Sequence, residues 1–273
     1  MPVLIHQDSG IRSAADGNGY LAGILAQAWE KGLLESYRFV GVLGRSREKT
    51  EALARRLGCR ACFALGDLME EEPDYVVEAA SVEAVKSCGE AVLSGGADLL
   101  VLSIGAFADP SFYEKMEHCA AANKRRIHIL SGAVGGFDVL RTVSLMSAAG
   151  AGDLRARMRT EKGPASLKGT PLFEEKLMGE GDKTKVFSGS AKEAIGLLPT
   201  KVNVAVAASL ATAGPEHTHF EIYSVPGMKG DDHRIEAEAE DVRAVVDIYS
   251  QTAAIAAWSA VARLRNLASP VVF

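Results

Sequence analysis

The chain has 273 residues, of which 48% are apolar and 24% charged, and its formal net charge is -5 at pH 7. This composition is typical of a globular protein with a substantial core, in one large or two modest domains. The negative charge argues against a general nucleic-acid surface, which would need clustered Lys and Arg. Because there is no apolar run that could span a bilayer and no signal-peptide pattern in Met1–Gly10, we expect a cytoplasmic protein without membrane or nucleic-acid partners.

The four cysteines are scattered over the first half of the chain, at positions 59, 62, 88 and 119. Only Cys59 and Cys62 have a Cys-x-x-Cys spacing, which would suit a redox pair or half of a zinc site. No second pair of ligands lies nearby in the sequence. We therefore expect reduced, mostly structural thiols and no metal site.

The N-terminal segment contains a glycine motif. Val3–His6 is a candidate strand, and Gln7–Asp16 is polar without a regular pattern. Gly17-Asn18-Gly19-Tyr20-Leu21-Ala22, a G-x-G-x-x-A string, then opens a helix over Tyr20–Lys31. Such glycines allow a tight turn and close approach of a pyrophosphate, and the small Ala22 allows the helix to pack on its strand. The motif should follow a strand directly, so a simple helix start stays open as the alternative.

The second predicted strand, Tyr37–Leu43, ends in a basic turn, Gly44-Arg45-Ser46-Arg47, before a helix that continues to Leu57. In dinucleotide-binding folds an acidic residue at this place holds the ribose 2′-hydroxyl of NAD, whereas Arg accommodates the 2′-phosphate of NADP. Because Arg45 and Ser46 stand where the acidic residue would be, we expect NADP as the preferred cofactor and NAD as the alternative. The other interpretation is a solvated basic turn without a ligand.

Strands and helices then alternate. The pattern predicts strands over Tyr75–Ala79, Asp98–Ser103 and Arg126–Leu130, with helices over Ser81–Ser94 and Ser111–Asn123. This order predicts right-handed crossovers and an α/β fold with a Rossmann-like, doubly wound parallel sheet. Ligands of such sheets lie beyond the carboxyl ends of the strands. The residues at those ends that we expect to contact the cofactor are Ala80, Ser81, Ser103 and Gly105.

Leu130–Leu140 contains three glycines in five residues, between a predicted strand and a helix over Phe137–Ala149. A strand, a glycine-rich turn and a helix N-terminus present several free amide N–H groups to an anionic ligand. Ser131, Gly132 and Ala133 are therefore candidate ligand contacts. A tight turn without a ligand would use the same residues.

The second half of the chain alternates less regularly, which predicts an α+β domain. The expected boundaries are 1–130 for the dinucleotide-binding domain, completed by a C-terminal helix within 250–273, and 131–249 for the second domain. The predicted strands cover Leu154–Thr160, Thr184–Ser190, Phe220–Ser224, His233–Ala239 and Val242–Ile248. The predicted helices cover Ala191–Leu197, Val202–Ala213 and Ser250–Leu267.

Several strings, in the same order along residues 32–266, resemble the L-aspartate dehydrogenase family. Val77–Val85 is similar to the family's nicotinamide-side turn, Leu102–Asp109 to its next strand end, and Ser131–Asp138 to the glycine turn that opens the substrate side. Further similar strings are Leu167–Pro171, Phe187–Ala194 and Val202–Ala207. Any one string is unspecific, but their number and order make the resemblance specific.

The resemblance implies NAD(P)-dependent oxidation of L-aspartate to iminosuccinate, which hydrolyses to oxaloacetate and ammonia or feeds NAD biosynthesis. It also implies that His233 is the catalytic acid/base, since an imidazole with an ordinary pKa of about 6.5 exchanges a proton at neutral pH. The implied substrate contacts are Ser131, Gly132, Ala133, Lys162 and Asn203, with Ala133 also contacting the cofactor. We further expect a homodimer or a larger homo-oligomer.

Two strings depart from the family pattern. The family's Asn-Pro-Lys-Thr before the last helix is Tyr249-Ser250-Gln251-Thr252 here, and its Thr-Arg-Lys is Thr160-Glu161-Lys162, which keeps only the lysine. These departures leave open a dehydrogenase for another small amino or hydroxy acid. The separation of the glycine motif from its predicted strand also leaves open a catalytically silent dinucleotide-binding sensor. A metal site at His217, His219 and His233 is a weaker alternative, because no acidic or thiol ligand has a suitable spacing to them.

Overall fold

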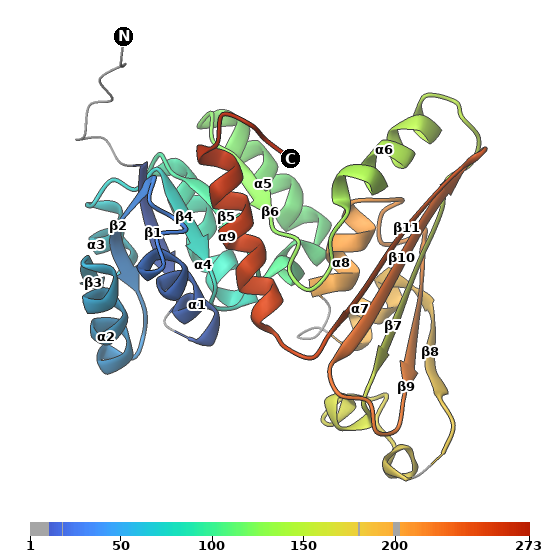
Figure 1. Cartoon of the computed structure of the whole chain (residues 1–273). Coiled ribbons are helices and arrows are strands. Elements are labelled where there is room, and N and C mark those ends of the chain that lie inside the picture. The colour runs from blue at the N-terminus through green and yellow to red at the C-terminus, as the bar shows by residue number, and fades with distance from the viewer. Residues whose placement is uncertain (1–10, 18, 180, 199–202) are drawn as a thin grey trace. The chain divides into compact units, whose positions relative to one another are not determined.

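The computed structural model of the protein describes residues 11–17, 19–179, 181–198 and 203–273. The chain folds into two compact units (Figure 1). The first takes its described residues from Met1–Ala106, Pro110–Leu130 and Ala257–Phe273, and the second consists of Phe107–Asp109 and Ser131–Ala256. No helix in the described ranges combines the length and apolar character needed to cross a membrane.

The first unit is built on a six-stranded parallel sheet with the strand order β3-β2-β1-β4-β5-β6. The strands are β1 (Ile11–Asp16), β2 (Tyr37–Leu43), β3 (Arg60–Cys62), β4 (Tyr75–Glu78), β5 (Asp98–Val101) and β6 (Ile127–Ile129). The order reverses between β1 and β4, which is the topological switch point of a doubly wound fold. The predicted Rossmann-like fold is confirmed, although β3 and the short helix after it were not predicted.

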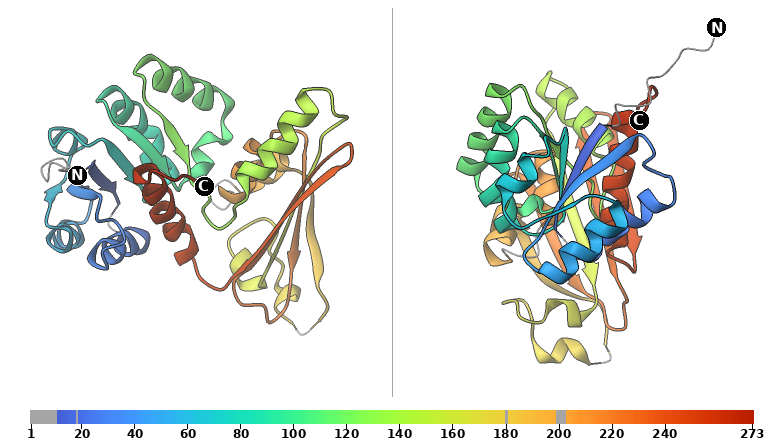
Figure 2. Two further views of the ribbon diagram at one scale, coloured as in Figure 1. Left: turned by 45° about the horizontal axis from the view of Figure 1, so that its top comes forward. Right: turned by 90° about the vertical axis from the view of Figure 1, so that its left-hand side faces the viewer.

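Helices cover both faces of this sheet, so the middle residues of its central strands, such as Ala14, Val77 and Leu100, are small or apolar and buried. Figure 2 shows α4 and α5 on one face and α9 on the other. The helices are α1 (Tyr20–Glu30), α2 (Arg47–Leu57), α3 (Leu65–Met69), α4 (Val82–Ser94), α5 (Pro110–Ala122) and α9 (Ala254–Ala268), with a 3₁₀ turn, η1, over Ile104–Ala108.

Strand β1 corrects the prediction that Gln7–Asp16 is irregular throughout. Residues Ile11–Asp16 pair with both β2 and β4, so the glycine motif follows its strand directly. The pattern was missed because a central strand at a switch point is crowded on both faces: Ser13, Ala14 and Ala15 are at most 1% exposed. Small residues of low strand propensity fit there. The strand predicted at Val3–His6 lies outside the described residues.

The second unit has a five-stranded mixed sheet, in the order β11-β10-β7-β9-β8, with only β7 and β9 parallel. The strands are β7 (Arg155–Lys162), β8 (Thr184–Ser190), β9 (Thr218–Ser224), β10 (Asp231–Ala239) and β11 (Val242–Ser250). The last helix therefore begins at Ala254 and not at the predicted Ser250, because β11 continues to Ser250, which pairs with Asp231.

Three helices pack on this second sheet, as Figure 1 shows: α6 (Phe137–Ala148) on β10 and β11, α8 (Asn203–Leu210) on β7, and α7 (Ala191–Leu197) on β8 and β9. Short 3₁₀ turns, η2 (Pro164–Leu167) and η3 (Glu175–Met178), follow β7. Alternate residues such as Met158 and Ile235 are buried. The residues that alternate with these buried ones along each strand include charged residues. Arg155 and Glu238, for example, form an exposed ion pair at 2.6 Å.

Helix α9 is fastened to the first sheet by buried polar contacts. The Tyr37 hydroxyl donates to the carbonyl oxygen of Leu264 at 2.6 Å. Arg263 Nη2 lies 3.0 Å from Nδ1 of His128, whose Nε2 lies 3.2 Å from Asp98 Oδ2. A guanidinium can only donate, so Nδ1 accepts and Nε2–H donates to Asp98. This ring is thus neutral, in agreement with burial, which lowers the pKa of His128.

We predict that Arg263→Met lowers the free energy of unfolding by about 1–3 kcal/mol, because the buried Nδ1 of His128 loses its donor. Urea denaturation at pH 7.5 measures the change. Lys115→Met is the matched control, since the Lys115–Glu90 pair is more than half exposed on both sides and such pairs contribute little. Equal unfolding free energies in the two variants would contradict the anchoring role.

Candidate active site

The glycine motif closes tightly on the carboxyl ends of two strands. Gly17 follows β1 with φ +125°, and its N–H donates to the carbonyl oxygen of Leu43 at 2.9 Å. A Cβ at Gly17 would lie 2.7 Å from the carbonyl oxygen of Ala79. Only glycine satisfies both the positive φ and this close approach. The backbone therefore turns sharply between the ends of β2 and β4.

The N-terminus of α1 is suited to a phosphate. Gly19 is the N-cap, no side chain caps the helix, and its first turn carries no acidic residue. A Cβ at Gly19 would have no other atom within 4 Å, so an approaching group meets open space there. Ala22 is 1% exposed, as close helix–strand packing requires. Free helix amides and the helix dipole attract an anion, so these residues fit the pyrophosphate of a dinucleotide.

Arg45 and Ser46 lie in the turn after β2, where the sequence predicts contacts to the adenosine ribose. Both are exposed, and Ser46 is the N-cap of α2 without a side-chain capping bond. The neighbouring Arg47 is engaged elsewhere: it pairs with Glu51 at 3.3 Å, and its guanidinium carbon lies 4.3 Å from the centre of the Phe63 ring. Arg45 is therefore the better placed of the two cations for a ligand.

The predicted contacts at the ends of β4 and β5 surround a buried carboxylate, Glu78. Its Oε1 accepts from the N–H of Ala80 and the hydroxyl of Ser103, both at 2.8 Å, and its Oε2 accepts from the N–H of Ser103 at 2.9 Å. Ser81 caps α4 by accepting from the N–H of Ala84 at 3.2 Å. Gly105 is buried within η1. We did not predict a role for Glu78, although a single charge in the apolar run Tyr75–Ala80 was the available signal.

In the second unit, paired positions of β7 and β10 bring four polar residues together. His233 lies opposite Thr160, and Asp231 lies opposite Lys162. His233 Nδ1 is 2.9 Å from Thr160 Oγ1, and Lys162 Nζ is 3.6 Å from Asp231 Oδ2. Thr160 is 1% exposed and His233 4% exposed. Thr160 and Asp231 were not predicted, because strand pairing is invisible in a single sequence.

The environment of His233 keeps its ring neutral. Burial lowers the pKa of His233 to about 4; the carboxylate of Asp231 opposes this, and the ammonium group of Lys162 adds to it. A neutral imidazole has one nitrogen that accepts a proton. At neutral pH the ring is therefore available as a base.

A small cavity of about 20 Å³ lies beside this cluster. Its lining combines hydroxyls and one ammonium group with apolar side chains: Thr160, Lys162, Ser166, Leu167, Thr170, Leu198, Val204, Phe220 and Ile222. Ser224, which pairs with Lys162 across β7 and β9, is 1% exposed, and its Oγ has no hydrogen-bond partner among the described residues. A cavity of this volume has room for about one water molecule.

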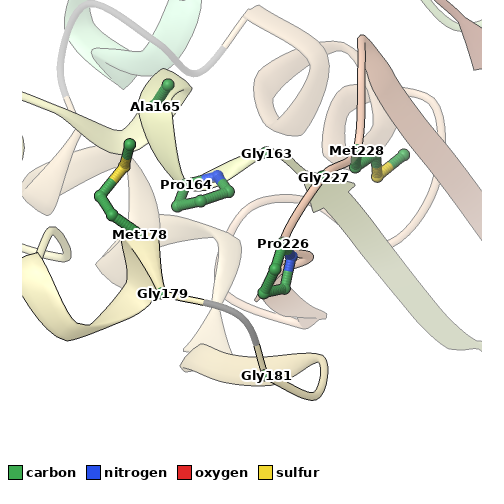
Figure 3. Close-up of a pocket in the computed structure, with 9 residues that line it drawn as sticks. All are labelled: Gly163, Pro164, Ala165, Met178, Gly179, Gly181, Pro226, Gly227 and Met228. Carbon is green, nitrogen blue, oxygen red and sulfur yellow. The ribbon is translucent and has the colours of Figure 1, made fainter.

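A wider depression of about 520 Å³ is formed by the segments that follow β7, η3 and β9. Figure 3 shows that its walls consist of backbone and apolar side chains. They are Gly163, Pro164, Ala165, Met178, Gly179, Gly181, Pro226, Gly227 and Met228. None of the described residues of this lining has a charged side chain.

The remaining predicted contacts lie in the second unit. Ser131, Gly132 and Ala133 form a turn in which the N–H of Val134 donates to the carbonyl oxygen of Ser131 at 3.1 Å, and Gly132 has φ +61°. Asn203 is the first residue of α8 and precedes Val204, which lines the small cavity.

The histidines do not gather around a metal. His219 is exposed, with Nε2 near Ser188 Oγ at 3.4 Å, whereas His233 is buried among the inward-facing residues. The described residues contain no group of three or more His, Cys, Asp or Glu that could hold a metal ion.

The fold and its glycine turn define a nicotinamide-dinucleotide-binding protein with a separate α+β unit. Residues 17–130 match the model of the NAD-binding domain of homoserine dehydrogenase, and residues 140–267 match that of the C-terminal part of aspartate dehydrogenase. The L-aspartate dehydrogenase of Methanocaldococcus jannaschii is 30% identical over 270 residues, which cover 93% of this chain and 96% of that one. The chain therefore belongs to the L-aspartate dehydrogenase family.

Two further relatives agree. The L-aspartate dehydrogenase of Methanothermobacter thermautotrophicus is 33% identical over 237 residues, covering 83% of this chain and 84% of that one. The crystal structure of aspartate dehydrogenase from Thermotoga maritima superposes with a TM-score of 0.75 at 25% identity, over 97% of this chain and 100% of that one. The family resemblance predicted from the sequence is confirmed.

We predict that His233 remains neutral from pH 8 to about pH 5 and takes up a proton only as the pH falls through about 4. Lys162→Met raises this pKa, because a nearby positive charge disfavours the imidazolium, whereas Asp231→Asn lowers it further. Titration of the His233 ring signals by NMR measures both changes. An unfolded histidine binds its proton near pH 6.5, so stability falls as the pH drops from about 6.5 to 4, by about 3 kcal/mol from this ring. A wild-type midpoint near 6.5 would contradict the assignment.

Proposed function

We propose that the protein is an NAD(P)-dependent dehydrogenase that oxidises the amino group of L-aspartate to iminosuccinate, which hydrolyses to oxaloacetate and ammonia. The observation that carries this proposal is the cluster of Thr160, His233, Lys162 and Asp231, of which Thr160 and His233 are buried, in the α+β unit of a chain from the L-aspartate dehydrogenase family. A neutral base beside an ammonium group matches a substrate that loses a proton and carries carboxylates.

Oxidation of the amino acid removes a hydride from Cα and a proton from the amino group. The nicotinamide ring, when bound, accepts the hydride. The protein must accept the proton, and we assign this role to Nε2 of His233. In that tautomer Nδ1–H donates to Thr160 Oγ1, which fixes the plane of the ring. The low pKa of His233 keeps Nε2 unprotonated and free to accept, but it also makes the ring a weaker base than the ordinary imidazole expected from the sequence.

Lys162 has the charge to bind a substrate carboxylate. Its side chain is 16% exposed and is held 3.6 Å from Asp231, so its position is restricted before a ligand arrives. Preorganised charge costs less on binding than a freely moving lysine. Asn203 and the turn at Ser131, Gly132 and Ala133 supply an amide side chain and backbone N–H groups for the remaining contacts.

For the cofactor we propose NADP over NAD. Gly17, Gly19 and Ala22 provide the pyrophosphate turn, and Ala80, Ser81, Ser103, Gly105 and Ala133 complete the predicted binding set. The preference rests on Arg45 and Ser46, because an exposed Arg and a hydroxyl favour a 2′-phosphate, and the turn has no acidic residue to hold a 2′-hydroxyl. A homo-oligomer and a cytoplasmic location remain predictions from the sequence.

The decisive experiment is a spectrophotometric assay of NADP⁺ and NAD⁺ reduction with L-aspartate, and with a panel of other dicarboxylates, amino acids and hydroxy acids. We expect aspartate-dependent reduction. Reduction with another acid instead would reassign the substrate. Saturable dinucleotide binding without any reduction would favour the silent sensor, an alternative that the comparisons with known proteins do not support.

We predict that His233→Ala lowers kcat at least about a hundredfold, the usual contribution of a general acid or base, while cofactor affinity is retained. Steady-state kinetics and calorimetric titration of the cofactor measure the two quantities. His219→Ala is the matched control, because that ring is exposed on the sheet, and its kcat should stay within about twofold. Unchanged turnover of His233→Ala would remove this residue from the mechanism.

We predict that Arg45→Asp shifts the ratio of kcat/KM for NADP over NAD towards NAD by about tenfold or more, since a carboxylate repels the 2′-phosphate and accepts from a 2′-hydroxyl. Arg47→Asp is the control, because Arg47 already contacts Glu51 and Phe63. If both variants keep the wild-type ratio, the turn after β2 does not select the cofactor.

A further inference from the structure

Glu78 is a buried charge without a counter-ion. It is 1% exposed, and the described residues form no salt bridge with it. Its carboxyl oxygens accept from neutral donors of Ala80 and Ser103. Burying an ion without a partner of opposite charge costs free energy, even when its hydrogen bonds are satisfied. A buried carboxylate of this kind is stabilised where a bound group supplies the missing positive charge.

The hydrogen bonds favour the ionised form. The N–H of Ala80 donates to Oε1 and the N–H of Ser103 donates to Oε2. Backbone amides only donate, so both oxygens must accept. A protonated carboxyl keeps some acceptor capacity, but these donors stabilise it less than they stabilise a carboxylate. Burial raises the pKa of Glu78, and the hydrogen bonds from Ser103 and Ala80 oppose this, as expected for a carboxylate held ionised against desolvation.

The position of Glu78 in the sheet relates this charge to one half of a dinucleotide. Glu78 ends β4, next to β1 at the switch point. In doubly wound folds the ribose at the end of β2 belongs to adenosine, so the half of the sheet that begins at β4 receives the other nucleoside. The residue after Glu78, Ala79, is also the one against which Gly17 packs. Glu78 thus ends a strand on the half of the sheet that, in doubly wound folds, receives the nicotinamide nucleoside.

We propose that Glu78 makes the site discriminate between the two redox forms of the cofactor, binding the oxidised form more tightly relative to the reduced form. The inference rests on the proposed function, because it requires a nicotinamide cofactor. The oxidised ring carries one positive charge that the reduced ring lacks, and the rest of the two molecules is the same. A fixed negative charge therefore stabilises the first selectively and favours oxidation of the substrate over its reverse.

Calorimetric titrations with NADP⁺, NADPH, NAD⁺ and NADH test the proposal without any turnover. We expect the wild-type protein to bind the oxidised form at least as tightly as the reduced form. Glu78→Gln should reduce this preference about tenfold, because it removes the negative charge and keeps the shape of the side chain. Ser103→Ala, which keeps the charge but removes a hydroxyl from it, should change both affinities by the same factor.

The outcomes separate charge from local structure. A glutamine cannot accept from both amides, so Glu78→Gln can weaken all dinucleotides, and ADP-ribose, which has no nicotinamide, measures that common loss. An unchanged ratio of oxidised to reduced affinity in a folded Glu78→Gln protein overturns the proposal. If that variant does not fold, the titrations of the wild-type protein test the proposal. Tighter binding of the reduced form than of the oxidised form by the wild type overturns the proposal equally. Failure of the wild type to bind any dinucleotide would instead refute the proposed cofactor, and binding without aspartate oxidation would refute only the substrate.

Discussion

The close approach of Gly17 to Ala79 is the constraint on which the first unit depends. Because a Cβ at Gly17 would lie 2.7 Å from the Ala79 carbonyl oxygen, the chain can leave β1, pass the end of β4 and enter α1 only with glycine there. The same contact brings the amides of the α1 N-terminus to the turn that Glu78 holds. Phosphate binding and the strand ends of the second half of the sheet are thus parts of one local structure.

The two units use buried ionisable groups in opposite ways. In the first, Glu78 has three hydrogen-bond donations to its oxygens, which favour the carboxylate. In the second, His233 has one bond, to Thr160, and desolvation leaves the ring neutral. Burial favours the neutral form of both groups, and only at Glu78 do several hydrogen bonds oppose it. Glu78 supplies a fixed negative charge, and His233 supplies a nitrogen lone pair that can accept a proton.

Prediction from sequence failed where packing overrides local preference. The residues of β1 have little strand propensity, yet they form the central strand because only small side chains fit between the helix layers. The last helix was predicted to start at Ser250, but pairing with Asp231 keeps that residue in β11. His233 was predicted from the family resemblance, whereas Thr160 and Asp231, its neighbours across the pairing of β7 and β10, were not.

By itself the sequence determined the alternation of strands and helices, the glycine turn, the basic end of β2 and the family, because these depend on residues close together in the chain or on strings in a fixed order. Only the tertiary structure decided the pairing of β7 with β10, which sets the environment of His233, and the burial of Glu78 between two strand ends. Both features depend on residues that are distant in sequence, and burial determines their charge. A pattern of residue types records neither which strands pair nor how deeply a side chain is buried.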